Sequence, residues 1–261
     1  MKILKAIGLS VLITINTACL AVAKPTGYLS TAQEPNSYLI LPPAPTAHSP
    51  RMIADKAVHQ SAKILRGTSR WKQAQLDADL HFPFAAGTFS CALGIRISKK
   101  KTPALYRLLQ RTLVDAAVAV NRAKTFYRRE RPFVHYNETS CTPKDEAFLR
   151  QNGSYPSGHS AIGWVWALTL AEVAPDRENA LLLRGREFTE SRVVCDVHWY
   201  SDTLMGMLMG STVFARLNSN PAFLADVAAA RKEYRAMNDK SSPQRNCAWE
   251  QSALNLKWAR I

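Results

Sequence analysis

The stretch PSGHSAIGWVWALTLAEV, residues 156–173, carries the clearest structural signal in the chain. Apolar and helix-forming residues dominate it and Pro175 follows it, so it predicts a buried helix that begins near Ser157. The first backbone N–H groups of a helix have no partner inside it and attract phosphate oxygens, and Gly158 allows an anion to approach them closely. Taken alone, the stretch also fits a serine N-cap followed by a surface histidine, His159.

Helices joined by loops account for the other regular segments as well. Thr102-Pro103 and Thr142-Pro143 each place an N-cap hydroxyl before a proline, a typical helix start. No segment shows the sustained alternation of a strand, so we expect an all-α fold, a single-domain helical bundle. The expected helices cover approximately residues 51–80 with a break at Gly67, 102–128, 142–153, 157–173, 176–190, 196–217 and 220–238.

The N-terminus has the pattern of a cleaved secretory signal. A short basic start is followed by an uncharged apolar run over residues 6–20 and by Ala21-Val22-Ala23, the small-x-small pattern of a cleavage site. We therefore predict a signal peptide over residues 1–23 and a periplasmic or secreted protein. The other expected regions are a proline-rich arm (24–50), a helical domain (51–238) and a C-terminal tail (239–261).

Cysteine usage and hydropathy further narrow the class of protein. The four cysteines after the signal predict two disulfides in an exported protein, with the pairing left open: Cys91, Cys141, Cys195 and Cys247. None forms a C-x-x-C pair, which argues against a zinc site. The uncharged runs 161–171 and 203–215 are shorter than the roughly 20 apolar residues that span a bilayer, so we expect no membrane span.

The net charge of +14 is unevenly distributed. Eleven lysines and arginines lie between Arg96 and Arg131, against only Asp115 and Glu130. Such a block attracts phosphorylated substrates, nucleic acid or an acidic surface, but no recognisable nucleic-acid-binding motif is present. Lys124, Arg128 and Arg131 have the spacing of one helix side, where a mixture of lysine and arginine suits a tetrahedral oxyanion.

A second constellation follows at Ser191-Arg192, His198 and Asp202. His198 and Asp202 are four residues apart, so on a helix they would share one face and could form a hydrogen bond. A carboxylate that binds one imidazole nitrogen fixes the tautomer and makes the other nitrogen a better nucleophile or base. A buried structural His–Asp pair would have the same spacing.

Together these residues resemble a known family. The pattern K-x6-R-P, P-S-G-H and S-R-x5-H-x3-D of the phosphatidic acid phosphatase type 2 superfamily is met at residues 124–132, 156–159 and 191–202. The wider stretch 102–202 resembles the secreted bacterial class A non-specific acid phosphatases, and the resemblance covers about residues 50–235. It implies the helical bundle of that superfamily and metal-independent hydrolysis of phosphate monoesters, with a broad substrate range and transfer to alcohols as an added activity.

The resemblance also implies roles for single residues. His198 would attack phosphorus and form a phosphohistidine, Asp202 would orient His198, and His159 would protonate the leaving group and then activate water. One histidine must then be neutral and the other protonated, so we expect an acid pH optimum. We expect no metal or cofactor, because cations and backbone amides can stabilise the charge of the phosphoryl group. The groups implied to hold the phosphate oxygens are Lys124, Arg131, Ser157, Gly158 and Arg192.

Two other functions share part of this pattern. A vanadate-dependent haloperoxidase uses the same anion-binding residues, but haloperoxidases are typically much longer chains. A non-catalytic basic anion-binding protein would explain the charge and leave His159, His198 and Asp202 without a role. The sequence leaves open the natural substrate and the oligomeric state, a homo-oligomer included.

Overall fold

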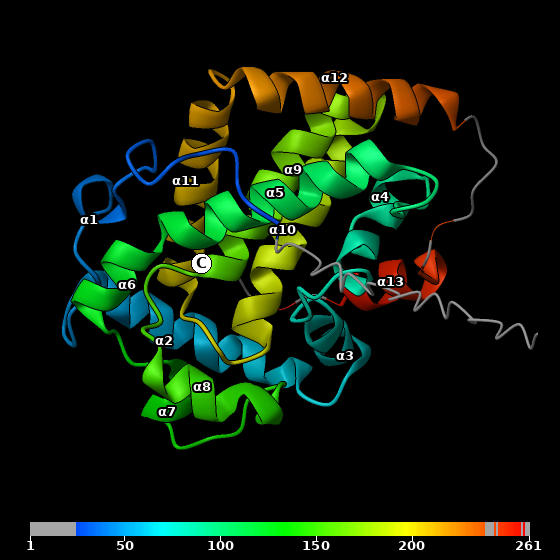
Figure 1. Ribbon diagram of the computed structural model, residues 1–261. Helices are drawn as coiled ribbons and strands as arrows, with labels where there is room; N and C mark the ends of the chain where they lie inside the picture. Colours follow the sequence, from blue (N-terminus) through cyan, green and yellow to red (C-terminus); the bar gives the residue numbers. More distant parts are fainter. Residues whose placement is uncertain (1–24, 238–242, 244, 257, 259–261) are drawn as a thin grey trace, which may run out of the picture.

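The computed structural model of the protein describes residues 25–237, 243, 245–256 and 258, and the predicted signal peptide lies outside them. Every regular element among these described residues is a helix, so the predicted all-α class is confirmed (Figure 1). The α-helices are α1 (Ser37–Ile40), α2 (Pro50–Ala62), α3 (Ser69–Leu76), α4 (Ser90–Leu93), α5 (Pro103–Ala119), α6 (Asn121–Tyr127), α7 (Pro132–His135), α8 (Glu146–Gln151), α9 (Gly158–Val173), α10 (Glu178–Val194), α11 (Tyr200–Leu217), α12 (Pro221–Ala236) and α13 (Cys247–Leu254).

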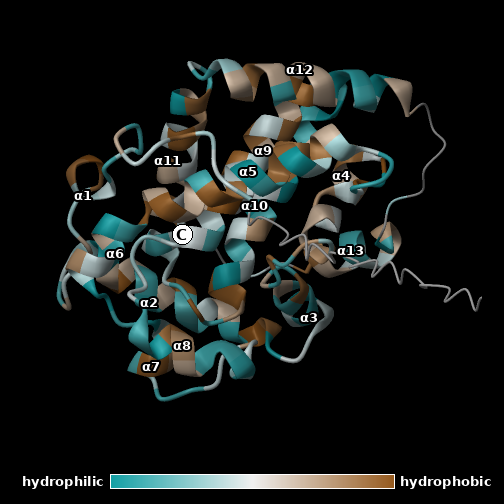
Figure 2. Ribbon diagram, viewed as in Figure 1, coloured by the Kyte–Doolittle hydropathy of each residue, from teal (hydrophilic) through white to brown (hydrophobic). Residues whose placement is uncertain are grey.

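Helix α9, the helix predicted from residues 156–173, is the centre of the bundle. It packs most extensively against α10 and α11 and also contacts α5 and α12 (Figure 1). Its buried side chains include Ala161, Val165, Trp166 and Leu170, so it is apolar on all sides, as expected of a helix enclosed by others. The outer helix α12 instead alternates apolar and polar residues (Figure 2). No helix of the described chain is long and apolar enough to cross a bilayer.

Glycines bring both neighbours close to α9. A Cβ on Gly206 of α11 would lie 2.4 Å from the carbonyl oxygen of Ser157, and a Cβ on Gly185 of α10 would lie 2.4 Å from the Cβ of Ala167. Neither distance leaves room for a side chain, so each helix approaches α9 as closely as the backbone allows. One turn before Gly206, the carbonyl of Asp202 accepts a hydrogen bond of 2.9 Å from the Ser157 N–H. The close packing thus sets the start of α9 beside the start of α11.

Two expected helices differ from the observed ones. The helix expected over residues 102–128 is divided at Val120 into α5 and α6. The helix expected over 196–217 begins only at Tyr200, so the expectation that His198 lies on a helical face with Asp202 is wrong. The Trp199 N–H donates to the Asp202 carboxylate over 2.9 Å, which starts the helix after Trp199. His198 therefore lies in the loop between α10 and α11.

The terminal regions are fixed to the bundle where they are described. In the arm predicted over residues 24–50, the Tyr28 N–H donates to the Asp115 carboxylate on α5 at 2.9 Å. The region predicted as a tail contains α13, which packs against α3. The two predicted disulfides are confirmed, and the pairing that the sequence left open is Cys91–Cys247 and Cys141–Cys195.

Candidate active site

Three segments meet at the N-terminus of α9: the end of α6 with the loop after it, the loop directly before α9, and the end of α10 with the α10–α11 loop. A Cβ on Gly158 would lie 3.8 Å from Cε of Lys124, and an Arg131 guanidinium nitrogen lies 3.1 Å from Nε2 of His198. The structure brings together the residues to which the family resemblance assigns roles: Lys124, Arg131, Ser157, Gly158, His159, Arg192, His198 and Asp202.

The three cations of the site are held by backbone carbonyls. Lys124 Nζ donates to the Gly153 carbonyl at 2.7 Å, and Arg192 donates to the Ala74 carbonyl at 2.5 Å. Arg131 donates to the carbonyls of Leu149, Asn152 and Val197 at 2.8 to 3.1 Å. Among the described residues no carboxylate forms a salt bridge with any of the three, and the buried Nε of Arg192 has no hydrogen-bond partner.

Their pKa values reflect this arrangement. Burial lowers the pKa of Lys124 to about 7, and the charge of Arg131 lowers it further while Asp202 opposes the shift. Burial also lowers the pKa of Arg131 and that of Arg192 to about 10 each. Cations that lose solvation without gaining carboxylate partners form a site that an anion would stabilise.

His198 is fixed in one tautomer. Arginine can only donate, so the Arg131 guanidinium at 3.1 Å requires a lone pair on Nε2 of His198. On the other side of the ring, Nδ1 lies 3.2 Å from the Ser154 hydroxyl, and that hydroxyl donates to the Asp202 carboxylate at 2.5 Å. Burial and then the charges of Arg131 and Lys124 hold the pKa of His198 well below its ordinary value, so the ring is neutral. Its Nε2 is thus unprotonated and directs its electron pair to the cationic side of the site, where Arg131 donates to it.

His159 occupies the first turn of α9 on the same side. Its Nε2 lies 2.9 Å from the Ala78 carbonyl, which can only accept, so Nε2 carries the proton. Burial, followed by the charge of Arg192, lowers the pKa of His159 to about 3. Without a ligand, His159 is therefore neutral at mildly acid pH.

The start of α9 supplies neutral donors. The Ser157 hydroxyl accepts from the Ser160 N–H at 3.2 Å and from the Ser160 hydroxyl at 2.9 Å, so its own proton can be donated to a ligand. Gly158 is the first residue of the helix, where the backbone N–H has no partner within the helix. Both groups therefore suit an anion at this helix start.

Three buried or half-buried residues complete the site and were not predicted. Besides Ser154, Arg129 donates to the Asp202 carboxylate at 2.5 Å and to that of Asp55 at 2.6 Å. Ser154 lies in the stretch that carries the family resemblance, but Arg129 is one member of a basic run, and nothing in the sequence distinguishes it. Arg128, in contrast, is exposed and ends α6 with a positive φ of 43°.

One group of side chains in the described chain could in principle hold a metal ion, and it includes a residue of the α10–α11 loop. It consists of His59, Glu138 and Asp196. Lys63 and Arg66 already form ion pairs with Glu138, and Arg66 also pairs with Asp196 at 2.6 Å. The two carboxylates are thus neutralised by protein cations, so this group does not suit a metal ion.

Comparison with known proteins agrees with this geometry. Residues 105–221 match the PAP2 superfamily. The non-specific acid phosphatase of Salmonella typhimurium is 42% identical over 214 residues, which cover 82% of this chain and 84% of the relative. The non-specific acid phosphatase of Providencia stuartii is 40% identical (79% and 84% covered), and the acid phosphatase of Zymomonas mobilis is 40% identical (82% of each chain). The chain belongs to the non-specific acid phosphatases of the PAP2 superfamily.

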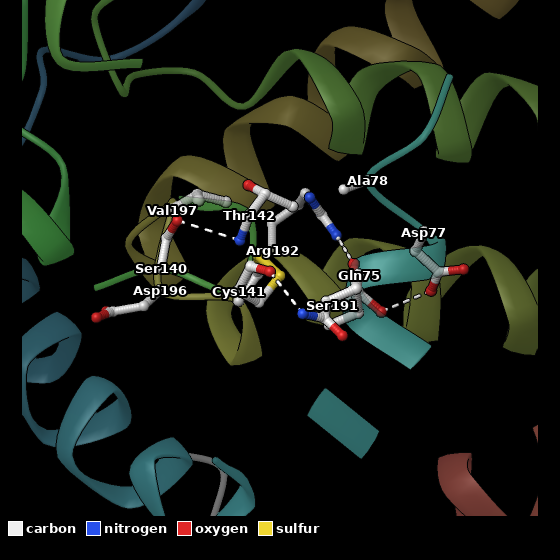
Figure 3. The surroundings of a disulfide bond; sticks show 12 residues. Gln75, Asp77, Ala78, Ser140, Cys141, Thr142, Ser191, Arg192, Asp196 and Val197 are labelled. Atoms are coloured by element: carbon white, nitrogen blue, oxygen red, sulfur yellow. Dashed lines mark hydrogen bonds between the residues drawn. A yellow bond between two sulfur atoms is a disulfide. The ribbon is translucent and has the colours of Figure 1, made fainter. Parts of the chain in front are cut away.

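In this PAP2 family member a disulfide braces the candidate active site. Cys195 lies between Arg192 and His198 in the chain, and its carbonyl accepts from the Cys141 N–H at 3.0 Å. The Cys141 carbonyl in turn accepts from the Gln75 side chain at 2.8 Å. Figure 3 shows the disulfide beside Arg192, between the segments that contain Gln75 and Thr142. The bond thus joins the loop before α8 to the segment carrying His198, and the hydrogen bond from Gln75 adds the end of α3.

We predict different effects for the two disulfides. Removing either by paired Cys→Ala substitution should lower the free energy of unfolding by about 2–5 kcal/mol. Cys141→Ala/Cys195→Ala should also lower kcat, because the loop that carries His198 loses its covalent brace. Cys91→Ala/Cys247→Ala is the matched control and should leave kcat unchanged at temperatures where the protein is folded. Urea unfolding and phosphatase assays measure both effects; equal kcat values in the two variants would contradict the bracing role.

Proposed function

We propose that the protein is an acid phosphatase that hydrolyses phosphate monoesters without a metal ion, through a phosphohistidine on His198. The observation that carries this proposal is the orientation of His198, whose Nε2 lone pair faces Arg131 while Nδ1 faces Asp202 through Ser154. A nitrogen held in this way is a nucleophile directed at the place where the cations attract an anion. The relatives are named as acid phosphatases, which supports the same reaction.

In the first step, Nε2 of His198 forms a bond to phosphorus as the ester P–O bond breaks. His159 donates a proton to the departing alkoxide, so that an alcohol leaves. The negative charge on the transferred group is stabilised by the three cations and by the Ser157 hydroxyl and Gly158 N–H. The positive charge on the His198 ring is stabilised by the Asp202 carboxylate.

In the second step, a water molecule attacks phosphorus and the N–P bond breaks. His159 accepts a proton from this water, and inorganic phosphate leaves the site. An alcohol in place of water would yield a new phosphate monoester, so the same intermediate allows phosphotransfer. The site grips the phosphoryl group, which is common to all monoesters, and we therefore expect a broad range of small phosphorylated substrates.

We expect an acid optimum because His159, whose pKa is low in the free site, must receive its proton from the bound ester. A phosphate monoester has a second pKa of about 6 and binds below that pH mainly as its monoanion. The monoanion brings in the proton that His159 later donates. The bound negative charge raises the pKa of His159, so that the ring can hold this proton until the leaving group accepts it. Above this range the ester arrives without the proton.

The arrangement supports a metal-independent reaction. Phosphoryl transfer needs mainly positioning and charge stabilisation, which Lys124, Arg131 and Arg192 can provide. Asp202, the carboxylate beside them, has both oxygens engaged by Arg129, Ser154 and the Trp199 N–H. We also infer action after export, in the periplasm or outside the cell, because two disulfides fit an oxidising compartment.

His198→Ala should reduce hydrolysis of a chromogenic phosphate monoester by about 10³-fold or more, because the variant lacks the nitrogen that accepts the phosphoryl group. The assay contains EDTA and compares the variant with the wild type at pH 5. Substantial residual activity in the variant would overturn the nucleophile assignment. A wild type that cannot hydrolyse esters, but oxidises bromide with vanadate and peroxide, would instead support a haloperoxidase.

His159→Ala should affect substrates according to their leaving groups. Alkyl phosphates need a proton on the departing oxygen, whereas activated aryl phosphates leave without one. We expect kcat/KM to fall at least about tenfold more for alkyl than for nitrophenyl esters. Equal losses for both classes would show that His159 is not the general acid.

The pH dependence of kcat/KM should include a contribution from Lys124. Its pKa of about 7 means that the free enzyme loses this cation as pH rises through about 7, which weakens anion binding. Lys124→Arg retains the charge at higher pH and should move the alkaline limb of the kcat/KM profile upward, even if kcat falls. An unmoved alkaline limb would show that Lys124 does not titrate there.

A further inference from the structure

We propose that Ser154 is a positioning residue for the phosphatase reaction: its hydroxyl connects Asp202 to His198 and determines which nitrogen of His198 is free to attack. This inference rests on the proposed function of His198. Ser154 is fully buried in the loop between α8 and α9, and His198 and Asp202 are 4% and 0% exposed. In this buried setting a hydrogen bond is stronger than in water, and an unpaired polar group is costly.

The direction of the hydrogen bonds follows from the number of available protons. The Ser154 hydroxyl has one proton, and the Asp202 carboxylate at 2.5 Å can only accept it. The contact of 3.2 Å between the same hydroxyl and Nδ1 of His198 therefore requires a proton on Nδ1. Arg131 independently requires a lone pair on Nε2. Both constraints select the tautomer whose Nε2 can attack phosphorus.

Asp202 does not perform this task alone. The nearest distance between its carboxylate and Nδ1 of His198 is 3.5 Å, longer than a good hydrogen bond. One carboxylate oxygen is held by Arg129 at 2.5 Å, and the other accepts from the Trp199 N–H at 2.9 Å. Arg129 is itself held by Asp55 at 2.6 Å. Because Asp202 is fixed on both sides, the Ser154 hydroxyl supplies the link to the ring.

Ser154 is in turn held by its own backbone. Its N–H donates to the Arg129 carbonyl at 2.8 Å, and the preceding carbonyl of Gly153 accepts from Lys124. A Cβ on Gly153 would lie 2.6 Å from the Lys124 carbonyl, so the loop lies directly against the end of α6. The same short loop therefore positions a phosphate-binding cation and the nucleophilic histidine.

The role in the reaction concerns the charge on the ring. When Nε2 bonds to phosphorus, the ring becomes positive and the Nδ1 proton is attracted to Ser154, whose own proton is held by the negative Asp202. No proton needs to leave Nδ1. Without the hydroxyl, the Nδ1 proton loses its acceptor and the ring can place its proton on Nε2 instead, which removes the attacking electron pair.

The test compares Ser154→Ala with Ser154→Thr, which retains the hydroxyl. Ser90→Ala is the matched control, because Ser90 is also fully buried and donates one hydrogen bond of 2.8 Å, to the Gly87 carbonyl, outside the site. Rapid-quench measurement of phosphohistidine formation should show a loss of at least about tenfold for Ser154→Ala, with the inhibition constant of inorganic phosphate changed by less than about twofold. In Ser154→Ala, imidazole ¹⁵N chemical shifts should show the proton of His198 moving from Nδ1 towards Nε2. Ser154→Thr should keep this proton on Nδ1 and recover most of the phosphorylation rate, and Ser90→Ala should match the wild type.

Other outcomes separate this inference from the proposed function. Wild-type phosphorylation rates in Ser154→Ala, with His198→Ala inactive, would overturn the role of Ser154 and leave the phosphatase mechanism intact. Activity in His198→Ala would overturn the mechanism itself. Equal losses of rate and phosphate affinity in Ser154→Ala and Ser154→Thr, with an unchanged tautomer, would show a purely structural role and overturn the inference. Should Ser154→Ala fail to fold, Ser154→Cys, whose thiol donates only weakly, replaces it with the same expected loss.

Discussion

The desolvation of three cations that lack a carboxylate ion pair is the constraint on which the rest of the site depends. Lys124, Arg131 and Arg192 are gathered without a carboxylate partner, and their lowered pKa values show the cost of that arrangement. Backbone carbonyls hold them in place without neutralising them. The positive potential therefore remains available for a ligand, and after burial, the larger cause, it also keeps both histidines neutral in the free site.

The bundle provides the rigidity that such an arrangement requires. Glycines allow α10 and α11 to approach α9 closely, and this packing aligns the start of α9 with Asp202. The Cys141–Cys195 disulfide and the Arg131 contacts then fix the loop that carries His198. The carbonyls that hold the cations belong to loops around the site, so the loops and the cations depend on each other for their positions.

The sequence predicts local features of this structure well and long-range ones poorly. The helix starts at Pro103 and Pro221 were predictable because proline and the residue before it restrict the backbone locally. Even so, the Thr102 side chain does not cap its helix, and Glu233 of α12 accepts from the first free N–H groups instead. The late start of α11 depends on the side chain of Asp202 and on loop contacts.

The candidate site shows the same division. The three motifs specify the cations and histidines that the structure gathers there, and their roles remain predictions. The roles of Ser154 and Arg129 depend on contacts with residues 44 to 74 positions away, which no local spacing encodes. The pairing of the cysteines was likewise open because it depends on how α4, α13 and the loops meet.

The cations that are held by backbone carbonyls have a consequence for how folding stability depends on the surrounding phosphate concentration. A ligand that binds only the folded state adds to folding stability in proportion to the logarithm of its concentration. Under the proposed function inorganic phosphate, the product, is expected to be such a ligand, because it offers the charge that Lys124, Arg131 and the unpartnered Nε of Arg192 lack. We therefore expect the folded protein to be more stable, and its activity more inhibited, where phosphate is abundant than where phosphate is scarce.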